Sequence, residues 1–429
     1  MSMKIAVIGT GYVGLVSGVC FAEWGHDVVC VDNDSRKIDM LNHGQLPIFE
    51  PGLLELMQKN LARLTFTTSI DDATDRSDIL FIAVGTPPRP NGDADLSTVE
   101  QVTALIARRM KSYKLVVEKS TVPVQTGEWV KRTMTLHNVN SVPFDVASNP
   151  EFLREGSAVE DSLHPGRIVF GAESERAKGL LMDLYSPLGV PIVATDIQSA
   201  ELIKHASNSF LAMKISFINA VSRVCERSGA NIEEVARGMG LDSRIGASFL
   251  NAGIGFGGFC FPKDLQAFIR ISEKLGYDFR LLKEVEHIND DQKAWFVKGI
   301  EHLIWNLQGK TIGILGLAFK PDTDDMRFAP SIDIIGMLQR EGAHIRAYDP
   351  VAMPRAKEVL KDIEYCDDPY EVARGADCLA LLTEWAEFRS LDLARIKSLM
   401  HIPTIADGRN VFDPARVAEL GFIYKGIGR

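Results

Sequence analysis

The sequence predicts a mixed α/β protein with a doubly wound α/β domain at each end and an all-helical domain between them. Three observations predict this fold. At residues 4–8 and again from residue 310, an apolar run leads into a glycine turn, an amphipathic helix and a second apolar run. Residues 197–227 carry apolar side chains at helical spacing without interruption. We therefore expect three domains, covering 1–196, 197–306 and 307–429.

Composition limits the class of protein. A chain of 429 residues has room for two or three domains. A net charge of -10 argues against nucleic acid or an anionic membrane surface as the main partner. No segment approaches the roughly 20 apolar residues that span a bilayer, and the N-terminus enters a strand without a signal-peptide pattern. The six cysteines lack C-x-x-C or zinc-like spacing, so we expect no metal and a reducing, cytoplasmic setting.

The first glycine turn has the features of a dinucleotide site. The motif G-T-G-Y-V-G at 9–14 follows a strand and opens a helix, and the next strand ends at Asp32. Backbone N–H groups at the helix start would hold a pyrophosphate. Asp32 would accept a hydrogen bond from a ribose 2′-hydroxyl and repel a 2′-phosphate, which favours NAD. Arg36 and Lys37 nearby leave NADP open as the alternative.

Three more strands are predicted at 78–84, 114–120 and 144–148, and each runs into a loop of polar residues and prolines. These loops begin at Gly85, Ser120 and Ser148. In an open parallel sheet, ligands bind beyond the carboxyl ends of the strands, so three such loops at one edge indicate a site.

A single cysteine, Cys260, lies in the glycine-rich stretch GIGFGGFCFPKD at 253–264. The glycines would let the backbone bend and approach a ligand closely. Pro262 suits the first position of a helix, so Cys260 would lie near a helix N-terminus with Lys263 beside it, which favours the thiolate. Covalent catalysis is one interpretation, and a buried structural cysteine is the other.

The long helix and the last third of the chain supply further candidates. Lys204 and Asn208, four residues apart, would share one helix face, although an isolated pair of this kind usually faces solvent. In the second α/β pattern, Gly313 and Gly316 do not complete a dinucleotide motif. That half is therefore a candidate site for a nucleotide attached to the substrate, with Arg409 following its last strand.

Several long motifs in one order resemble the UDP-glucose/GDP-mannose dehydrogenase family over nearly the whole chain. They are GTGYVG at 9–14, VGTP at 84–87, EKSTVPV at 118–124, SNPEFLREGSA at 148–158, FLNAGIGFGGFCFPKD at 249–264, LAFKPDTDDMR at 317–327 and DGRNVFD at 407–413. The resemblance implies an oxidoreductase of nucleotide-sugar metabolism. The sugar C6 alcohol would become a carboxylate while two NAD are reduced, and the product would supply polysaccharide biosynthesis.

The resemblance also implies roles for individual residues. Cys260 matches the nucleophile that holds the aldehyde as a thiohemiacetal and then a thioester. Lys204 with Asn208 would stabilise oxyanions or help to deprotonate the alcohol, and Asp264 would position a catalytic water. Thr121 and Glu151 match residues around that water, with Glu151 a candidate general base.

Two binding sets follow from the same motifs. The cofactor set is Gly9, Gly11, Tyr12, Val13, Gly14, Asp32, Lys37, Thr86, Thr121, Glu155, Lys263 and Arg327. The nucleotide-sugar set is Glu151, Phe152, Leu153, Arg154, Glu155, Lys204, Asn208, Arg244, Phe249, Leu250, Asn251, Ala252, Gly253, Gly257, Lys320 and Arg409. An arginine at the position of Arg244 comes from a neighbouring subunit in relatives, which implies a homodimer or larger assembly through the central helices. Phe259 departs from the small polar residue of many relatives.

Three alternatives stay open. Within the family, the motifs FLREGSAVED and FLNAGIGFGG favour UDP-glucose, but GDP-mannose and UDP-N-acetylmannosamine are rival substrates. A two-electron β-hydroxyacid dehydrogenase would lack a cysteine at position 260 and a third α/β domain. A non-catalytic NAD sensor or scaffold would need no thiol, lysine and carboxylate in one pocket.

Overall fold

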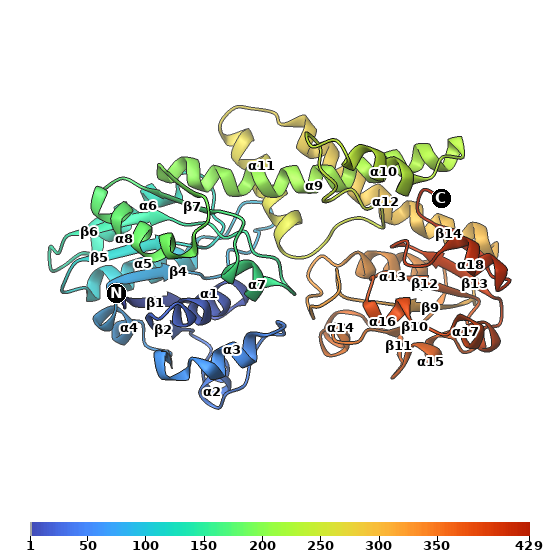
Figure 1. Ribbon diagram of the computed structural model, residues 1–429, viewed down its shortest axis with the longest axis horizontal. Coiled ribbons are helices and arrows are strands. Elements are labelled where there is room, and N and C mark those ends of the chain that lie inside the picture. Colours follow the sequence, from blue (N-terminus) through green and yellow to red (C-terminus); the bar gives the residue numbers. More distant parts are fainter. Residues whose placement is uncertain (1) are drawn as a thin grey trace. The chain divides into compact units, whose positions relative to one another are not determined.

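The computed structural model describes residues 2–429, which form two compact units. The first unit runs to Ser207 and includes Gln266–Gly276, and the second contains Asn208–Leu265 and Tyr277–Arg429. Helices α9 (Ile197–Ser228) and α11 (Cys260–Lys274) each contribute residues to both units. Figure 1 labels the elements, and each unit contains one sheet with helices packed on it.

The sheet of the first unit has eight strands in the order β3-β2-β1-β4-β5-β6-β7-β8. Every neighbouring pair is parallel except β6 and β7, which run antiparallel through Ala147↔Ala172 and Ser148↔Gly171. Strands β7 and β8 extend the sheet beyond the strands that the sequence pattern marked. The strands are β1 (Lys4–Ile8), β2 (Asp27–Val31), β3 (Leu64–Thr67), β4 (Ile79–Ile82), β5 (Lys114–Glu118), β6 (Phe144–Ser148), β7 (Ile168–Ala172) and β8 (Ile192–Thr195).

Helices cover both faces of this sheet, as its buried, nearly continuous apolar strands require. Ile5 and Val7 of β1 pack into one apolar core, and Ala6 and Ile8 pack into another on the opposite face. The helical segments before α9 are α1 (Tyr12–Glu23), α2 (Ser35–Asn42), α3 (Leu53–Lys59), η1 (Leu61–Arg63), α4 (Ile70–Arg76), α5 (Ser97–Arg109), α6 (Thr126–His137), α7 (Ala158–Leu163), α8 (Glu175–Tyr185) and η2 (Ser186–Leu188).

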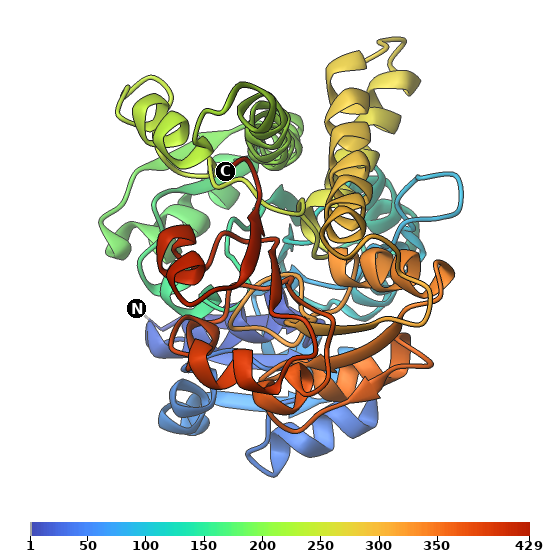
Figure 2. The same ribbon diagram turned by 90° about the vertical axis from the view of Figure 1, so that its right-hand side faces the viewer.

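The central part of the chain is dominated by long helices. The predicted long helix is confirmed, since α9 has 32 residues and is therefore about 48 Å long. Figure 1 shows it from the side and Figure 2 nearly end-on. It is followed by α10 (Ile232–Gly240), α11 and α12 (Arg280–Ile304). Residues 241–259 form the long loop that joins α10 to α11, and no strand lies in this region, as expected for a helical domain.

The second sheet has six parallel strands in the order β11-β10-β9-β12-β13-β14. Phe296 and Ile300 of α12 and Ile334 of α13 pack into one core with Ile312 and Ala406 of the sheet. The strands are β9 (Thr311–Leu315), β10 (His344–Tyr348), β11 (Glu364–Tyr365), β12 (Cys378–Leu381), β13 (Thr404–Asp407) and β14 (Ile423–Gly426). The helices are α13 (Pro330–Arg340), α14 (Met353–Val359), α15 (Pro369–Ala373), α16 (Ala386–Arg389), α17 (Leu393–Leu399) and α18 (Pro414–Glu419).

No helix in 2–429 has the length and apolarity to cross a membrane. No group of three or more histidine, cysteine or carboxylate side chains in that range could hold a metal ion. The predicted fold class, two doubly wound α/β regions and a central region of long helices, is confirmed.

Candidate active site

The glycine turn after β1 is shaped by close contacts with the neighbouring strand. Gly9 has φ 108°, its N–H donates to Val31 O at 2.7 Å, and a Cβ there would lie 2.4 Å from Ala83 O. A Cβ on Gly14 would lie 1.9 Å from Gly9 O. A Cβ on Gly11, by contrast, would meet nothing within 4 Å. Gly9 and Gly14 therefore serve the fold, whereas Gly11 leaves open space at the N-terminus of α1, as a bound pyrophosphate requires.

Asp32, the residue after β2, is held as a carboxylate. Its Oδ2 accepts from the Thr10 N–H at 2.9 Å and the Thr10 hydroxyl at 2.7 Å, and its Oδ1 accepts from the Asp34 N–H at 3.0 Å. Burial raises the pKa of Asp32, but the hydrogen bonds from Asp34 and Thr10 outweigh it, so the pKa lies below its usual value. Lys37 pairs with Asp32 at 3.4 Å and Arg36 pairs with Asp34 at 3.0 Å. Both cations are thus neutralised, which favours NAD over NADP.

The loops after β4 and β5 meet, as the sheet topology predicts. The buried Thr86 hydroxyl donates to Thr121 O at 2.9 Å. Side chains of α9 hold the rest of the second loop: His205 Nε2 bonds Val122 O at 2.7 Å, and Glu201 accepts from the N–H groups of Gln125 at 2.7 Å and Gly127 at 2.8 Å.

Sequence reasoning missed Glu201 and His205. The sequence gives only a weak indication of their role: both are polar residues close to Lys204 on the same predicted helix. Burial raises the pKa of Glu201 to about 7, against the lowering effect of its bonds to Gly127 and Gln125.

Lys204 and Glu151 form a buried ion pair in the first unit. The Lys204 ammonium donates to Glu151 Oε1 at 2.8 Å and to Glu151 O at 2.7 Å, and both side chains are about 5 % exposed or less. Glu151 Oε2 accepts from the Leu153 N–H at 2.9 Å. The solvent-facing alternative for Lys204 is therefore wrong.

The rest of the loop after Glu151 is held from several sides. The Phe152 ring lies under the Arg167 guanidinium at 4.0 Å and near the Lys204 ammonium at 5.4 Å. Arg154 is exposed and pairs with Asp161 at 2.6 Å. Glu155 follows on this loop, and Glu50, which sequence reasoning missed, accepts from the N–H groups of residues 156 and 158 at 2.8 and 2.7 Å.

The second unit holds the cysteine and the other predicted catalytic groups. Helix α11 begins at Cys260, two residues before Pro262, which the sequence predicted as the first helical position. Asp264, one turn further on, is fully buried and accepts from the Asn208 amide at 2.6 Å. Lys263 pairs with Asp264 at 2.8 Å. Asn208 is thus buried as well, and the solvent-facing alternative is wrong for it too.

Aromatic and cationic side chains surround the start of α11. The Phe259 ring lies 4.2 Å from the Arg327 guanidinium and 5.4 Å from the Lys263 ammonium. Arg327 also makes a two-pronged contact with Asp325 at 2.8 and 2.9 Å. Cys260, the first residue of α11, is partly exposed, and both cations beside Phe259 are paired with carboxylates, Lys263 with Asp264 and Arg327 with Asp325.

The glycines before Cys260 are explained by packing against the protein. A Cβ on Gly255 would lie 2.7 Å from Asn289 Oδ1, one on Gly257 2.2 Å from Phe328 O, and one on Gly258 2.7 Å from the Phe319 ring. Packing of the protein itself is therefore enough to require glycine at these three positions, and Gly255 and Gly258 also have positive φ, 104° and 79°.

Amide side chains fix the same loop. Asn289 donates to Phe256 O at 3.1 Å and accepts from its N–H at 2.8 Å. Asn219 accepts from the Gly253 N–H at 2.8 Å, and Gln292 donates to Gly253 O at 2.9 Å. Sequence reasoning missed all three, because nothing local to a polar residue on a helix says which distant backbone it bonds.

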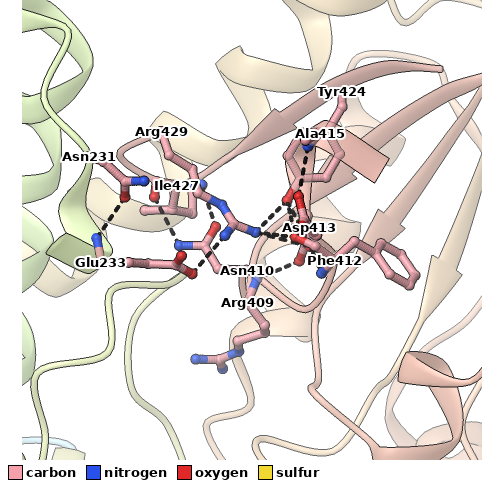
Figure 3. Close-up of polar contacts among 11 residues, drawn as sticks. Asn231, Glu233, Arg409, Asn410, Phe412, Asp413, Ala415, Tyr424, Ile427 and Arg429 are labelled. Atoms are coloured by element: carbon pink, nitrogen blue, oxygen red, sulfur yellow. Dashed lines mark hydrogen bonds and ion pairs between the residues drawn. The ribbon is translucent and has the colours of Figure 1, made fainter. Parts of the chain in front are cut away.

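Arg409 links three loops of the second unit. Its guanidinium donates to Leu382 O at 2.9 Å, Gly255 O at 3.1 Å and Phe319 O at 3.3 Å. Figure 3 shows the polar network around its neighbour Asn410, whose side chain bonds both backbone groups of Ile427, and around the C-terminal Arg429.

Arg429 secures the end of the chain. It contacts Glu233 of α10 at 2.7 Å and the Tyr424 hydroxyl at 2.7 Å, so the last residues are tied to both the central helices and the second sheet.

The remaining predicted residues differ in their surroundings. Lys320 lies 5.3 Å from the Phe319 ring. Phe249 has φ 66° and lies 6.1 Å from the Phe261 ring, ahead of Leu250 to Gly253. Arg244 is exposed and pairs with Asp242 at 2.6 Å.

Comparison with known proteins gives concordant results. Sequence models of the UDP-glucose/GDP-mannose dehydrogenase family match residues 3–189 (NAD binding domain), 198–291 (central domain) and 313–414 (UDP binding domain). The UDP-glucose 6-dehydrogenase TuaD of Bacillus subtilis is 48% identical over 99% of this chain and 93% of its own length. The UDP-glucose 6-dehydrogenase of Rhizobium meliloti is 48% identical over the whole of both chains.

Solved structures agree. A UDP-glucose dehydrogenase from Pyrobaculum islandicum has a TM-score of 0.94 at 40% identity, covering 100% of this chain and 98% of its own. A UDP-D-ManNAc dehydrogenase from Pyrococcus horikoshii has a TM-score of 0.88 at 29% identity, covering 100% and 99%. Motifs, fold and relatives all agree, and the chain is a member of the UDP-glucose/GDP-mannose dehydrogenase family, whose NAD-dependent oxidoreductases share its three matched domains.

Proposed function

We propose that this chain oxidises the C6 alcohol of UDP-glucose to a carboxylate with NAD as the oxidant, releasing UDP-glucuronate. The observation that carries the proposal is the start of α11, where Cys260 is followed one turn later by the fully buried Asp264, bonded to Asn208. A simple alcohol dehydrogenase needs no thiol. Relatives that are UDP-glucose 6-dehydrogenases at 44–49% identity support UDP-glucose over GDP-mannose or UDP-N-acetylmannosamine.

The proposed reaction has two oxidations separated by a covalent intermediate. The C6 alcohol first loses a proton and a hydride and becomes an aldehyde. The Cys260 thiolate adds to the aldehyde carbon and its oxygen takes up a proton, giving a thiohemiacetal. That carbon then loses a second hydride and its hydroxyl loses a proton, which leaves a thioester. Water attacks the thioester, the C–S bond breaks, and the carboxylate leaves with the thiolate restored.

Two NAD molecules accept the two hydrides. Overall, one alcohol and one water yield one carboxylate and three protons. The fit to NAD rests on the open space at Gly11, the N-terminus of α1 at Tyr12 and Val13, and the anionic Asp32. The other residues proposed for the cofactor are Lys37, Thr86, Thr121, Glu155, Lys263 and Arg327.

Lys204 and Glu151 are proposed to manage charge at the sugar C6 oxygen. An ammonium bonded to a carboxylate can stabilise an oxyanion or, with Glu151 as proton acceptor, assist loss of the alcohol proton. Asp264 is proposed to orient the water that hydrolyses the thioester, with Asn208 fixing its carboxylate and Thr121 lying near the water. Glu151 is the alternative general base for that step.

The sugar nucleotide is proposed to bind through the loop from Glu151 to Glu155, the loop from Phe249 to Gly253, Gly257, Lys320 and Arg409. Because the chain carries a net charge of -10, the diphosphate would depend on local cations and backbone N–H groups. Arg409 already bonds three carbonyls, so its contribution would be to fix the loops as well as to contact the ligand.

A homodimer or larger assembly is proposed through α9. Phe210, Phe217 and Val224 recur every seven residues on this helix and are each at least half exposed. An apolar stripe of this period fits a second helix. Arg244 would then act in the neighbouring subunit.

We further propose a cytoplasmic enzyme whose product supplies polysaccharide biosynthesis. Its functional domains would be 1–196 for NAD, 197–306 for catalysis and dimerisation, and 307–429 for the UDP-sugar.

The test is a stoichiometric assay of the purified chain with UDP-glucose, GDP-mannose and UDP-N-acetylmannosamine. We expect two NADH and one UDP-glucuronate per UDP-glucose, and at least 10-fold lower kcat/KM for the other two sugars. Cys260→Ala should lower complete turnover by about 1,000-fold or more, because the aldehyde can no longer be held. One NADH per sugar with free aldehyde, or normal turnover in Cys260→Ala, would refute the mechanism.

A further inference from the structure

A second buried lysine lies behind the Glu151–Lys204 pair. Lys119 follows β5 directly and is 7 % exposed. Its ammonium donates to Asn149 Oδ1 at 3.1 Å and lies 3.4 Å from Asn149 O. No carboxylate lies within ion-pair distance of it among residues 2–429. A buried ammonium without a direct counter-ion is costly, so its presence calls for an explanation.

Lys119 holds the residue that begins the Glu151 loop. Asn149 is 2 % exposed, and its N–H donates to Glu118 O at 2.8 Å while its amide donates to Val169 O at 2.8 Å. The Tyr185 hydroxyl donates to the same Asn149 Oδ1 that accepts from Lys119. Asn149 is thus a fixed point two residues before Glu151.

A cavity adjoins the loop that carries Glu151. A cavity of about 130 Å³ is lined by Lys119, Asn149, Glu151, Phe152 and other residues of α1, β7 and the adjoining loops. Packing alone therefore leaves the underside of the loop incompletely supported.

The charge of Lys119 also bears on the pair itself. Burial lowers the pKa of Lys119 to about 8, while the charge of Glu151 raises it and the charge of Lys204 lowers it further. The charge of Cys20 has a smaller raising effect on the pKa of Lys119, and burial raises the pKa of Cys20 itself to about 12.

We propose that Lys119 is a positioning residue for the reaction: its ammonium fixes Asn149, two residues before Glu151, so that the Glu151 carboxylate stays against Lys204, and it places a positive charge beside that pair. The proposal rests on the proposed function only in assigning Glu151 and Lys204 to the chemistry. Lys119 itself contacts neither reacting atoms nor cofactor in this account.

The experiment compares Lys119→Met, Lys119→Gln and Lys119→Arg in the full-length protein by pH–rate profiles of NADH formation with UDP-glucose. Removal of a positive charge disfavours deprotonation of the groups around it, so we expect the limbs of the kcat profile to move to higher pH by about half a unit or more in the Met and Gln variants. Lys119→Met should lower kcat about 10-fold with little change in the KM for NAD, Lys119→Gln should lower it less, and Lys119→Arg should leave the limbs in place.

Two matched controls separate positioning from folding. Lys114→Met removes another buried lysine of β5, whose ammonium bonds Ser77 O at the far end of the strand, and should leave the pH profile unchanged. Tyr185→Phe removes the other hydrogen bond to Asn149 Oδ1 without changing charge, and should lower kcat without moving the limbs. A Met or Gln variant whose profile overlays the wild type, or limbs that move equally in Lys114→Met, would overturn the proposal. Failure of the proposed function would instead appear in the wild-type protein, as absent or one-to-one NADH formation.

Discussion

The two doubly wound sheets begin in the same way and then diverge at one acidic residue each. Gly9 after β1 and Gly316 after β9 both have positive φ, 108° and 91°, and donate their N–H to the end of the neighbouring strand, Val31 O and Tyr348 O. An aspartate then follows the second strand of each sheet, Asp32 in the first and Asp349 in the second.

The two carboxylates are used differently. Asp32 accepts four hydrogen bonds, two of them from backbone N–H groups, those of Thr10 and Asp34, and the others from the Thr10 hydroxyl and the Lys37 ammonium. Asp349 accepts five hydrogen bonds, which come from the N–H groups of Leu317, Ala318, Val351 and Ala352 and from the Trp385 indole at 2.7–3.1 Å. Both acids bond the first residue after the glycine and the second residue after themselves, but Asp349 also accepts from the N–H of Ala318, the position that Gly11 has in the first sheet.

The helix after each turn differs accordingly. Helix α1 begins at Tyr12, close behind Gly9, whereas α13 begins at Pro330, after the loop 317–329. The comparison teaches that one topology can present either a helix N-terminus or a cation-bearing loop at its binding edge. Only the first arrangement needs the G-x-G-x-x-G motif.

The largest expected effect comes from removing the acid that closes the second turn. Asp349→Asn replaces an acceptor with an NH₂ group that faces backbone N–H donors, and should lower the free energy of unfolding by about 3 kcal/mol. Asp32 accepts from two backbone N–H groups where Asp349 accepts from four, so Asp32→Asn should lower the free energy of unfolding by only about 1 kcal/mol or less. It should also raise the KM for NAD. Denaturant unfolding of both variants measures the difference. Equal losses of stability in the two variants would show that the two carboxylates contribute equally to the fold.

The sequence predicted this contrast in part. Gly313 and Gly316 do not complete G-x-G-x-x-G, which favoured dinucleotide binding in the first half only. Strand β6 and helix α9 were predicted almost to the residue. Local patterns suffice for these, because the apolar period and the flanking turn residues lie within a few positions.

What could not be predicted depends on residues distant in the chain. Several hydrogen bonds join segments 30 or more residues apart: Leu317 to Asp349, Glu201 to the loop after β5, and Asn289 to Phe256. Other bonds of Asp349 reach across a turn whose path is set by tertiary packing. The antiparallel pairing of β6 with β7 has the same origin. The packing of Asn289, Phe328 and Phe319 against the glycines at 255, 257 and 258 could not be predicted for the same reason.

The substitution Gly11→Ala makes the glycine turn of the first sheet more like that of the second. Ala318 lies two residues after Gly316, where the first sheet has Gly11 two residues after Gly9. A Cβ at Gly11 meets nothing in the protein, so Gly11→Ala should leave the melting temperature within about 1 °C. It should raise the KM for NAD about 30-fold, because the methyl group occupies the space proposed for the pyrophosphate. Unchanged NAD affinity in a stable variant would show that the open space is not the phosphate site.

The smallest expected effect distinguishes how the two units hold their loops. In the first, the loop after β5 depends on Glu201, whose pKa burial raises to about 7, whereas in the second the loop before Cys260 depends on the neutral amides of Asn219, Asn289 and Gln292. Because the folded protein takes up a proton on Glu201 more readily than the unfolded chain does, the resulting stability is fully present below about pH 4.5 and is lost as the pH rises through about 7.

Glu201→Gln lacks this titration. The stability of the wild type relative to the variant should therefore fall by about 1–2 kcal/mol between pH 5.5 and pH 8, measured by denaturant unfolding. Glu118, which is buried and whose pKa the charge of Glu201 helps to raise, contributes in the same direction, so Glu118→Gln should show a similar but separate trend. Asn289→Ala serves as the matched control in the second unit, where the loss of stability should be the same at both pH values. A pH-dependent loss in Asn289→Ala, or none in Glu201→Gln, would show that charge is not what separates the two ways of holding a loop.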